Sequence, residues 1–541
     1  MTTETSAEIT DPSLAREAEP LVQRLVEDRA ASKLAAGDPT LWGPEAESEA
    51  SVRLAWTTLH ETSRGLLAEI DALRAELHDE GLSRVVLAGM GGSSLAPEVI
   101  TATAGTQLVV LDTTDPGQVA DALEGELDRT VVVVSSKSGT TVETDSHRRI
   151  FEQAFTEEGI DPARRMIVVT DPGSPLQELG ERAGYRRVFT ADPNVGGRYS
   201  ALSAFGLVPA GLAGADVAAL LDDAAAAFPN LRSDDAANPA VRLAAALAAA
   251  HGNGAEKVVL ADSGSGIVGF GDWVEQLIAE STGKSGLGLL PVPVENVEAP
   301  GFATAGQDAT PVAIGPADGT ASVNTHGPLG GLMLLWEFAT ALAGRLIGIN
   351  PFDQPDVEAA KRAARSLLDG PAGGPAATPL TVDGAVEIHP SGEWLSAGMG
   401  TVAEALRALV NAAPRDGYLA VQAYLDRLDD ASISVLRPEL ARRSGLQTTF
   451  GWGPRFLHST GQYHKGGHQN GVFLQITGDP GSDVEIPEQP YTLGALQRAQ
   501  ALGDGQVLAQ QHRPVLRLHL TDRAAGLVEL VKAVQDLRAA G

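Results

Sequence analysis

The sequence predicts an α/β protein built on parallel sheets, and three observations lead to this fold class. Short runs of Val, Ile and Leu, such as RVVLAG and TVVVVS, each end in Gly, Ser, Asp or Pro. Segments with apolar residues at three-to-four spacing, which is typical of amphipathic helices, lie between these runs. The runs lack polar alternation, as strands buried on both faces do. Such strands alternating with helices predict parallel sheets covered by helices on both sides.

We expect four parts along the 541 residues. Helical periodicity predicts an N-terminal helical segment over 1–50, and the strand-like runs that follow predict a first α/β lobe over 51–215. A second lobe over 216–370 begins after a polar bridge and ends with the helix after NPFDQP. The stretch GPAGGPAATP, Gly370–Pro379, is typical of a linker. Residues 371–541 then form a C-terminal α/β region.

The composition restricts the partners and the compartment. There are 40 Lys and Arg against 70 Asp and Glu, a net charge of −30, which argues against a nucleic acid or an anionic membrane as partner. The absence of Cys excludes disulfides and thiolate chemistry. The polar N-terminus lacks the pattern of a signal peptide. The longest apolar run, LMLLWEFATALAG, contains Glu337 and falls short of the roughly 18 residues of a membrane helix. We therefore expect a cytoplasmic protein.

A glycine-rich loop follows the first predicted strand. It has the sequence GMGGSSLAPEV, Gly89–Val99, and includes Gly92 and Ser93. Glycines allow backbone N–H groups to approach an anion, and the N-terminus of the following helix adds positive potential. The alternative interpretation is a tight turn between strand and helix.

A second loop, SSKSGTT, follows the strand TVVVVS. Ser136, Lys137, Ser138 and Thr141 supply hydroxyl and amine donors at the carboxyl end of a buried strand, where ligands bind in open parallel sheets. The alternative interpretation is an N-cap for a helix that starts near Val142, but one cap needs one hydroxyl rather than several. Together the two loops predict a cradle for a phosphate group without a metal.

Further polar side chains stand in apolar surroundings. Arg198 occupies a glycine-rich turn in GGRYSALSAFGL. Gln276 and Glu280 are four residues apart and share one helix face, and Gln354 and Lys361 are seven apart and also share a face. Taken singly, each charged residue could be a solvated side chain. The sequence contains no HExxH motif, and we expect neither a metal nor another cofactor.

Taken together, these segments resemble the phosphoglucose isomerase family. GMGGSSL, SSKSGTTVET, GGRYSALSAFGL, QLIAESTGK and NPFDQPDVEAAK are similar to five family motifs in the same order. The whole chain most resembles the isomerase portion of the transaldolase–phosphoglucose isomerase fusion group. The resemblance implies two sugar-isomerase (SIS) type parallel α/β sandwich lobes followed by the C-terminal α/β region. It also implies interconversion of glucose 6-phosphate and fructose 6-phosphate through ring opening and a cis-enediol.

The resemblance implies a role for each motif residue. Glu280 would move the proton between C1 and C2, Arg198 would stabilise the enediolate, and Lys361 would assist ring opening. The residues implied to contact the sugar phosphate are Gly92, Ser93, Ser136, Lys137, Ser138, Thr141, Gln276 and Gln354.

The histidine of the family does not stand where its motif predicts. In the family a Gly-Gln-His motif lies between the Glu and the Lys, whereas here HSTGQYHKGGHQNG follows Lys361 and has one extra residue between Gln462 and His464. We expect His464 to be the ring-opening acid or base, with His326 and His468 as alternatives. In the family this histidine comes from the partner subunit, so the resemblance implies a homodimer.

Two other functions stay open from the sequence. One is an isomerase that also accepts mannose 6-phosphate. The other is a non-catalytic sugar-phosphate sensor built on the same lobes, which would need the phosphate loops but not Glu280, Arg198 and Lys361 together.

Overall fold

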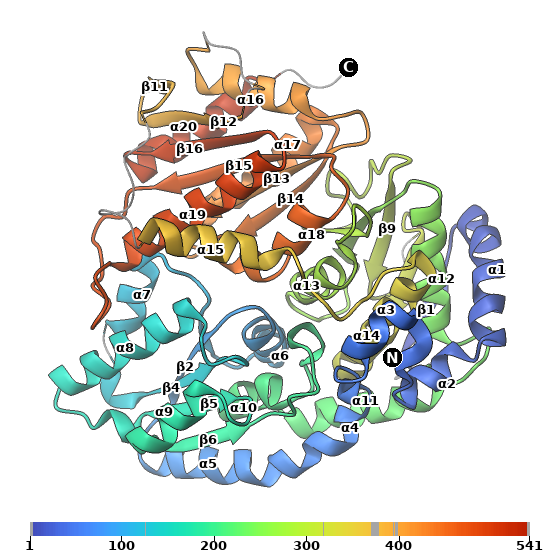
Figure 1. The fold of residues 1–541 in the computed structure, drawn as a ribbon, viewed down its shortest axis with the longest axis horizontal. Helices are drawn as coiled ribbons and strands as arrows, with labels where there is room; N and C mark the ends of the chain where they lie inside the picture. Colours follow the sequence, from blue (N-terminus) through green and yellow to red (C-terminus); the bar gives the residue numbers. More distant parts are fainter. Residues whose placement is uncertain are drawn as a thin grey trace.

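Three sheets form the framework of the protein (Figure 1). The computed structural model describes residues 4–124, 126–317, 319–368, 378–392, 394 and 399–537. Two of the sheets are wholly or mainly parallel and the third is mixed, which confirms the α/β fold class. The division into four parts stays a prediction, and residues 370–377 of the expected linker lie outside the described residues.

The first sheet has five parallel strands in the order β3-β2-β4-β5-β6. Its strands are β2 (Arg84–Gly89), β3 (Val109–Leu111), β4 (Thr130–Ser135), β5 (Met166–Thr170) and β6 (Arg187–Thr190). The helices of this part are α5 (Leu67–Asp79), α6 (Leu95–Ala104), α7 (Pro116–Leu123), α8 (Val142–Glu157), α9 (Pro175–Ala183) and α10 (Ala204–Leu212). The strand order reverses direction between β2 and β4, and ligands bind at such a switch point.

The second sheet has the order β1-β10-β9-β7-β8. Its strands are β7 (Lys257–Asp262), β8 (Leu290–Pro293), β9 (Ala309–Ile314), β10 (Val323–His326) and β1 (Ser6–Ile9). Its helices are α11 (Val217–Leu231), α12 (Pro239–Gly252), α13 (Phe270–Thr282), α14 (Leu329–Ile347) and α15 (Val357–Leu368).

The N-terminal segment differs from the expectation at its start. β1 pairs antiparallel with β10 at the edge of the second sheet, before the helices α1 (Pro12–Glu27), α2 (Ala30–Ala35), α3 (Pro44–Ala50) and α4 (Leu59–Thr62). Four residues of which Ala7 alone is buried give too short a pattern to predict a strand. Edge pairing, rather than periodicity, determines this strand.

The C-terminal region forms a mixed sheet in the order β11-β12-β16-β15-β13-β14. Its strands are β11 (Thr381–Asp383), β12 (Val386–Ser391), β13 (Tyr418–Tyr424), β14 (Gln447–Trp452), β15 (Gly471–Gly478) and β16 (Val515–Leu520). Its helices are α16 (Val402–Ala412), α17 (Leu436–Ser444), α18 (Gly461–Gly466), α19 (Leu493–Gln510) and α20 (Arg523–Gln535). α19 packs along α15, so this region lies directly against the other two (Figure 1).

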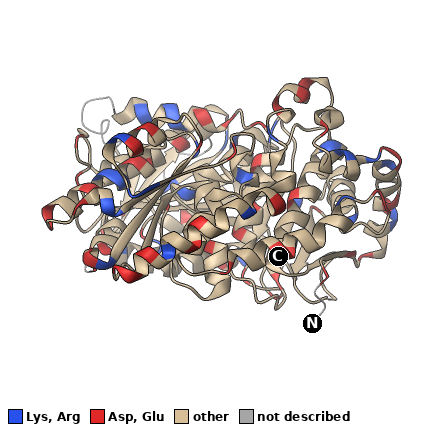
Figure 2. Cartoon of the chain, turned by 90° about the horizontal axis from the view of Figure 1, so that it is seen from below, with Lys and Arg blue, Asp and Glu red and all other residues tan. Residues whose placement is uncertain are grey.

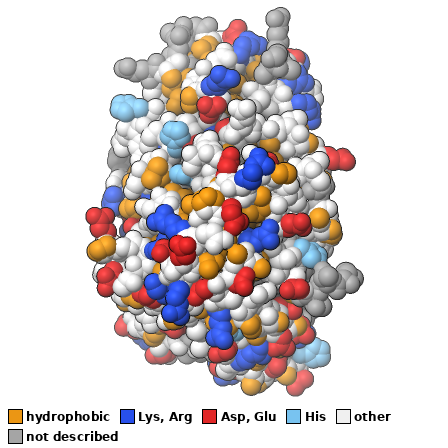
Figure 3. Space-filling model, turned by 90° about the vertical axis from the view of Figure 1, so that its right-hand side faces the viewer, with side chains coloured by type: hydrophobic (Ala, Val, Ile, Leu, Met, Phe, Trp, Pro, Cys, Tyr) orange, Lys and Arg blue, Asp and Glu red, His pale blue; other side chains and the backbone are white. Residues whose placement is uncertain are grey.

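Among the described helices, only α14 is long and apolar enough to cross a membrane. It is a core helix, because 83% of its apolar window is buried inside the protein. Figure 2 shows acidic and basic residues spread over the outer helices, with most strand residues uncharged. On the face in Figure 3, acidic, basic and hydrophobic side chains are intermixed without a broad basic patch.

Candidate active site

The two predicted loops start side by side at the switch point of the first sheet. Gly89 at the end of β2 pairs with Ser135 at the end of β4, so the glycine loop and the hydroxyl loop leave the sheet as neighbours. This is the position at which an open parallel sheet binds ligands.

The hydroxyl groups after β4 bind one another rather than capping α8. The Oγ of Ser136 and the Oγ1 of Thr141 are 3.0 Å apart, as are the Oγ of Ser138 and the Oγ1 of Thr140. Thr141 is the N-cap residue of α8, but its side chain makes no capping hydrogen bond. Ser138, Thr140 and Thr141 line a cavity, so their hydroxyls are available to a ligand.

Lys137 has a different environment from the hydroxyls beside it. Its Nζ lies 2.5 Å from Oδ2 of Asp171 and donates to the carbonyl of Pro193 at 3.1 Å. Lys137 is not among the residues that line the cavity. Its ammonium charge is therefore neutralised within the first lobe.

The glycines after β2 allow Gly197, the side chain of Gln276 and the carbonyl of His458 to approach this loop closely. A Cβ on Gly92 would lie 2.0 Å from the carbonyl oxygen of Gly197, the residue before Arg198. Gly91 has a φ of +56°, and a Cβ there would lie 2.8 Å from both the Gln276 side chain and the carbonyl of His458. Ser93 is buried in this contact and does not line the cavity. The glycine loop therefore packs against Gly197, the Gln276 side chain and the His458 carbonyl, and its residues do not line the cavity.

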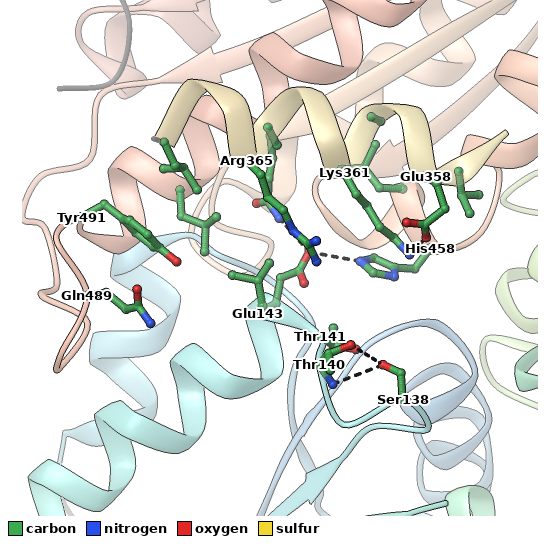
Figure 4. A pocket seen from close by; sticks show the side chains of 18 of the residues that line it. Ser138, Thr140, Thr141, Glu143, Glu358, Lys361, Arg365, His458, Gln489 and Tyr491 are labelled. Atoms are coloured by element: carbon green, nitrogen blue, oxygen red, sulfur yellow. Dashed lines mark hydrogen bonds and ion pairs between the residues drawn. The ribbon is translucent and has the colours of Figure 1, made fainter. Parts of the chain in front are cut away.

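The cavity has a volume of about 710 Å³ and lies between α8, α15, the start of α19 and the short 3-10 helix η10 (Arg455–His458). Of the predicted residues, it is lined by Ser138, Thr141, Gln354 and Lys361. Figure 4 shows Lys361 extending from α15 toward His458, and its Nζ donates to Oε1 of Glu358 at 3.0 Å. His458 and Glu143, which also line the cavity, are residues to which the sequence analysis assigned no role.

Arg198, Glu280 and Gln354 form one hydrogen-bonded group, in which Arg198 is buried, Glu280 is partly buried and Gln354 is exposed. The Nη1 of Arg198 donates to Oε1 of Gln354 at 2.7 Å and lies 3.3 Å from Oε2 of Glu280. Its remaining donors bind the carbonyls of Pro351 and Asp353. These hydrogen bonds hold the guanidinium group in one orientation, with the Glu280 carboxylate at one edge of its plane.

Burial raises the pKa of Glu280 above its ordinary value, against the opposing effect of Arg198, His458 and Lys361. A carboxylate held in this way is a stronger base than an exposed one.

Lys284 orders the chain segment that holds Arg198, although no role was predicted for it. Its Nζ donates to the carbonyl of Asn350 at 2.7 Å and to Oδ1 of Asp353 at 2.8 Å. Burial lowers the pKa of Lys284 to about 8, because the ion pair with Asp353 offsets only part of the desolvation. It belongs to the motif QLIAESTGK, which is the sequence signal for it.

His458 and Glu143 form an ion pair or hydrogen bond at the cavity wall. The Nε2 of His458 lies 3.1 Å from Oε1 of Glu143, which also accepts from Nε2 of Gln500 at 2.7 Å. Burial alone would raise the pKa of Glu143, but His458 and Lys361 lower it to about 2. Gln276 donates to the carbonyl of His458 at 2.9 Å. Glu143 stands in the quoted motif SSKSGTTVET, and His458 begins the histidine-rich segment, so both had a signal.

The predicted histidine, His464, lies elsewhere. It is buried in α18, where its Nδ1 is 3.1 Å from the hydroxyl of Tyr418 and its ring packs against Phe456 and Phe473. Burial lowers the pKa of His464 well below its ordinary value. The two alternatives, His468 and His326, do not line the cavity either. His468 pairs with Glu256, and His326 is the last residue of β10. The structure thus brings His458, and not His464, to the other predicted residues.

Among the described residues, one cluster of three carboxylates could hold a cation. Asp121, Asp426 and Asp429 lie close together, but they do not line the cavity and two of them are exposed. They are not part of the site described above.

Comparisons with known proteins agree with this geometry. Residues 27–286 match the family model described as phosphoglucose isomerase. A probable glucose-6-phosphate isomerase of Natronomonas pharaonis is 32% identical, and the match covers 53% of this chain and 79% of that protein. The matched model region includes Arg198 and Glu280 but ends before Lys361 and His458.

Two solved structures have a similar fold. A hypothetical protein from Thermus thermophilus has a TM-score of 0.57 at 25% identity, covering 66% of this chain and 97% of that one. A glucose-6-phosphate isomerase from Chlamydia trachomatis has a TM-score of 0.52 at 21% identity, covering 66% and 85%.

Proposed function

Because the chain belongs to the phosphoglucose isomerase family, we propose that its cavity binds a hexose 6-phosphate and interconverts glucose 6-phosphate and fructose 6-phosphate. The observation that carries this proposal is the hydrogen-bonded group of Glu280, Arg198 and Gln354, whose Gln354 lines the same cavity as Lys361 and His458. A base, a fixed cation and ring-opening groups are the parts that aldose–ketose isomerisation needs.

The phosphate group is assigned to the hydroxyl loop. Ser138 and Thr141 line the cavity and act as hydrogen-bond donors to it, while Ser136 positions Thr141. Gly92 packs against Gly197 and Ser93 is buried, so neither is assigned a contact in the cavity. The ammonium group of Lys137 is occupied by Asp171, so the hydroxyls account for most of the proposed contact.

Ring opening is assigned to His458 and Lys361. The ring oxygen needs a proton as the bond to the anomeric carbon breaks, and His458 is the proposed donor. Glu143 orients the imidazole and stabilises its protonated form, as a carboxylate behind a catalytic histidine does. Lys361 adds a cation at the same wall of the cavity.

The proton transfer is assigned to Glu280. Its carboxylate takes the proton from C2 of the open-chain aldose and returns it to C1, and the reverse reaction uses the same group. The negative charge that develops on the enediolate oxygen is stabilised by Arg198, whose orientation is fixed by carbonyl groups. Gln276 and Gln354 hold the side chains that face the sugar.

The assembly and the compartment also belong to this proposal. A homodimer rests on the family resemblance alone, because His458 reaches the cavity from the same chain. The strongly acidic composition supports a cytoplasmic enzyme whose partner is a sugar phosphate rather than a nucleic acid or a membrane.

The test is fructose 6-phosphate conversion by the wild type and by Glu280→Gln, followed with a coupled dehydrogenase and without added metal. We expect the substitution to lower kcat by about 10³-fold, within the range for loss of a general base. Glu275→Gln on the same helix is the matched control, because Glu275 lines a separate cavity and should keep kcat within about 3-fold. Full turnover by Glu280→Gln would refute the assignment, and wild-type binding without turnover would indicate a sensor.

A further inference from the structure

The C-terminal region meets the first lobe through η10, whose first and last residues both bind carboxylates. Arg455 begins the segment, and its Nη2 lies 2.5 Å from Oε2 of Glu98 and its Nε 3.4 Å from Oδ2 of Asp112. The side chain of Arg455 is only 10% exposed and that of Asp112 only 1%. His458 ends the segment beside Glu143.

The carboxylates that bind Arg455 belong to the first lobe. Glu98 stands in the first turn of α6, at the end of the glycine loop, and Asp112 directly follows β3. Arg427, which follows β13, also pairs with Glu98 at 2.8 Å. Burial alone would raise the pKa of Glu98, but Arg455 and Arg427 lower it to about 2. Glu98 therefore remains ionised, and removal of Arg455 would leave Glu98 and the buried Asp112 with only Arg427 among these cations, 3.9 Å from Asp112.

The distance between the two ends of the segment is short. Arg455 and His458 are three residues apart in one 3-10 turn, which rises by only about 2 Å per residue. The carbonyl of His458 is fixed by Gln276, and Gly91 packs against it. A displacement at Arg455 is therefore transmitted to the imidazole with little chain between them to absorb it.

We propose that Arg455 is a positioning residue for ring opening, because its ion pairs with Glu98 and Asp112 fix the segment that presents His458 to the cavity. The inference rests on the proposed role of His458. On this inference, the packing of the C-terminal region against the first lobe serves catalysis, because it places the proposed proton donor His458 in the site of the same chain.

Arg437 provides a matched control at another contact of the C-terminal region. It is buried, with its side chain 3% exposed, and its Nε and Nη2 lie 2.7 Å and 2.5 Å from the Glu295 carboxylate of the second lobe. Among the described residues it makes no hydrogen bond to η10. Replacing Arg437 thus removes a comparable ion pair without disturbing the support of His458.

The experiment measures two rates for fructose 6-phosphate at equilibrium in D2O. Exchange between anomers reports ring opening alone, whereas incorporation of deuterium reports the proton transfer at Glu280. Arg455→Gln should lower both rates by about 10- to 100-fold, since a displacement near 1 Å has effects of this size. Arg437→Gln should keep both rates within about 3-fold. Glu280→Gln should lower deuterium incorporation but leave anomer exchange unchanged.

Additional variants separate positioning from folding. Arg455→Lys keeps the cation and should recover at least half of the lost rate on a logarithmic scale, and it provides the test if Arg455→Gln does not fold. Equal rates in Arg455→Gln and Arg437→Gln, at similar melting temperatures, would overturn the inference. Unchanged anomer exchange in His458→Gln would refute the proposed role of His458 itself, which is a different outcome.

Discussion

Glu98 and Glu143 occupy like positions in the first lobe but have different partners. Each stands in the first turn of the helix that follows a loop at the switch point, Glu98 after the glycine loop and Glu143 after the hydroxyl loop. Each binds one end of η10 and has its pKa lowered to about 2. Their partners are two guanidinium groups for Glu98, but an imidazole and an amide for Glu143.

Because their partners differ, the Glu98 pair can only hold the segment in place, whereas the Glu143 pair can also transfer a proton. A guanidinium group keeps its proton at any pH of interest, so the Glu98 pair can hold the segment but cannot exchange a proton. An imidazole can act as a general acid or base, so the Glu143 pair can take part in ring opening. On this proposal, two similar carboxylates have two functions, which their partners from the C-terminal region determine.

The largest expected effect comes from removing the charge of Glu143. Glu143→Gln should lower kcat by about 10²- to 10³-fold, because the amide no longer stabilises a protonated His458. Glu98→Gln should lower it by at most about 10-fold, since Arg427 and Arg455 retain Asp112 nearby. Steady-state kinetics checks both, and equal losses would contradict the division between the two pairs.

A second prediction displaces the His458 end of the segment without changing a charge. In Gly91→Ala, the new Cβ would press on the carbonyl of His458 at 2.8 Å and would occupy a backbone with φ of +56°. We expect kcat to fall about 100-fold. Gly197→Ala, whose Cβ meets nothing within 4 Å, is the control and should stay within about 3-fold. A normal kcat for Gly91→Ala would show that the position of this carbonyl is unimportant.

The loss of kcat/KM in acid should report Glu280 rather than the carboxylate of Glu98 or Glu143. Glu98 and Glu143 stay ionised down to about pH 3, because the pKa of each is lowered to about 2. The pKa of Glu280 is raised, so activity should be lost as pH falls through a value above the ordinary 4.3 or so, by about 10-fold per pH unit. Undiminished kcat/KM at pH 4 in folded enzyme would contradict this.

The smallest expected effect is on stability in acid. The pKa of Glu98 is lower in the folded than in the unfolded chain, so its contribution is fully present above about pH 5 and is lost as pH falls toward 2. The wild type should therefore lose unfolding free energy between pH 6 and pH 3, and Glu98→Gln should lose about 1–2 kcal/mol less than the wild type. This figure is set low because Glu98 is partly exposed to solvent. Urea unfolding at the two pH values measures this, and an unchanged difference would show that Glu98 does not contribute.

The sequence predicted those parts of the site that short segments determine. Val131–Val134 and the loop after them form one strand and one turn, so composition and order were sufficient. The Glu280 and Arg198 motifs likewise lie in locally ordered segments, and in the structure their side chains lie 3.3 Å apart. By contrast, the choice between His458 and His464 depends on how β14, α18 and the first lobe pack together. Spacing within one histidine-rich segment contains no such information.

The burial of individual side chains was also inaccessible from sequence. His464 follows the Gln462 that resembles the family motif, but the fold encloses it between Tyr418 and Phe473. Lys137 follows the expected spacing for a phosphate contact, but Asp171 of a neighbouring strand end binds it first. Long-range partners, rather than local pattern, determine what each of these groups can reach.

The most direct test of the account compares fructose 6-phosphate turnover in His458→Gln and His464→Gln, each corrected for the folded fraction. The account predicts a loss of at least about 100-fold in kcat for His458→Gln, and turnover within about 3-fold of wild type for His464→Gln. The reverse pattern would contradict the assignment of His458. It would mean that the ring-opening group is not the histidine beside Glu143.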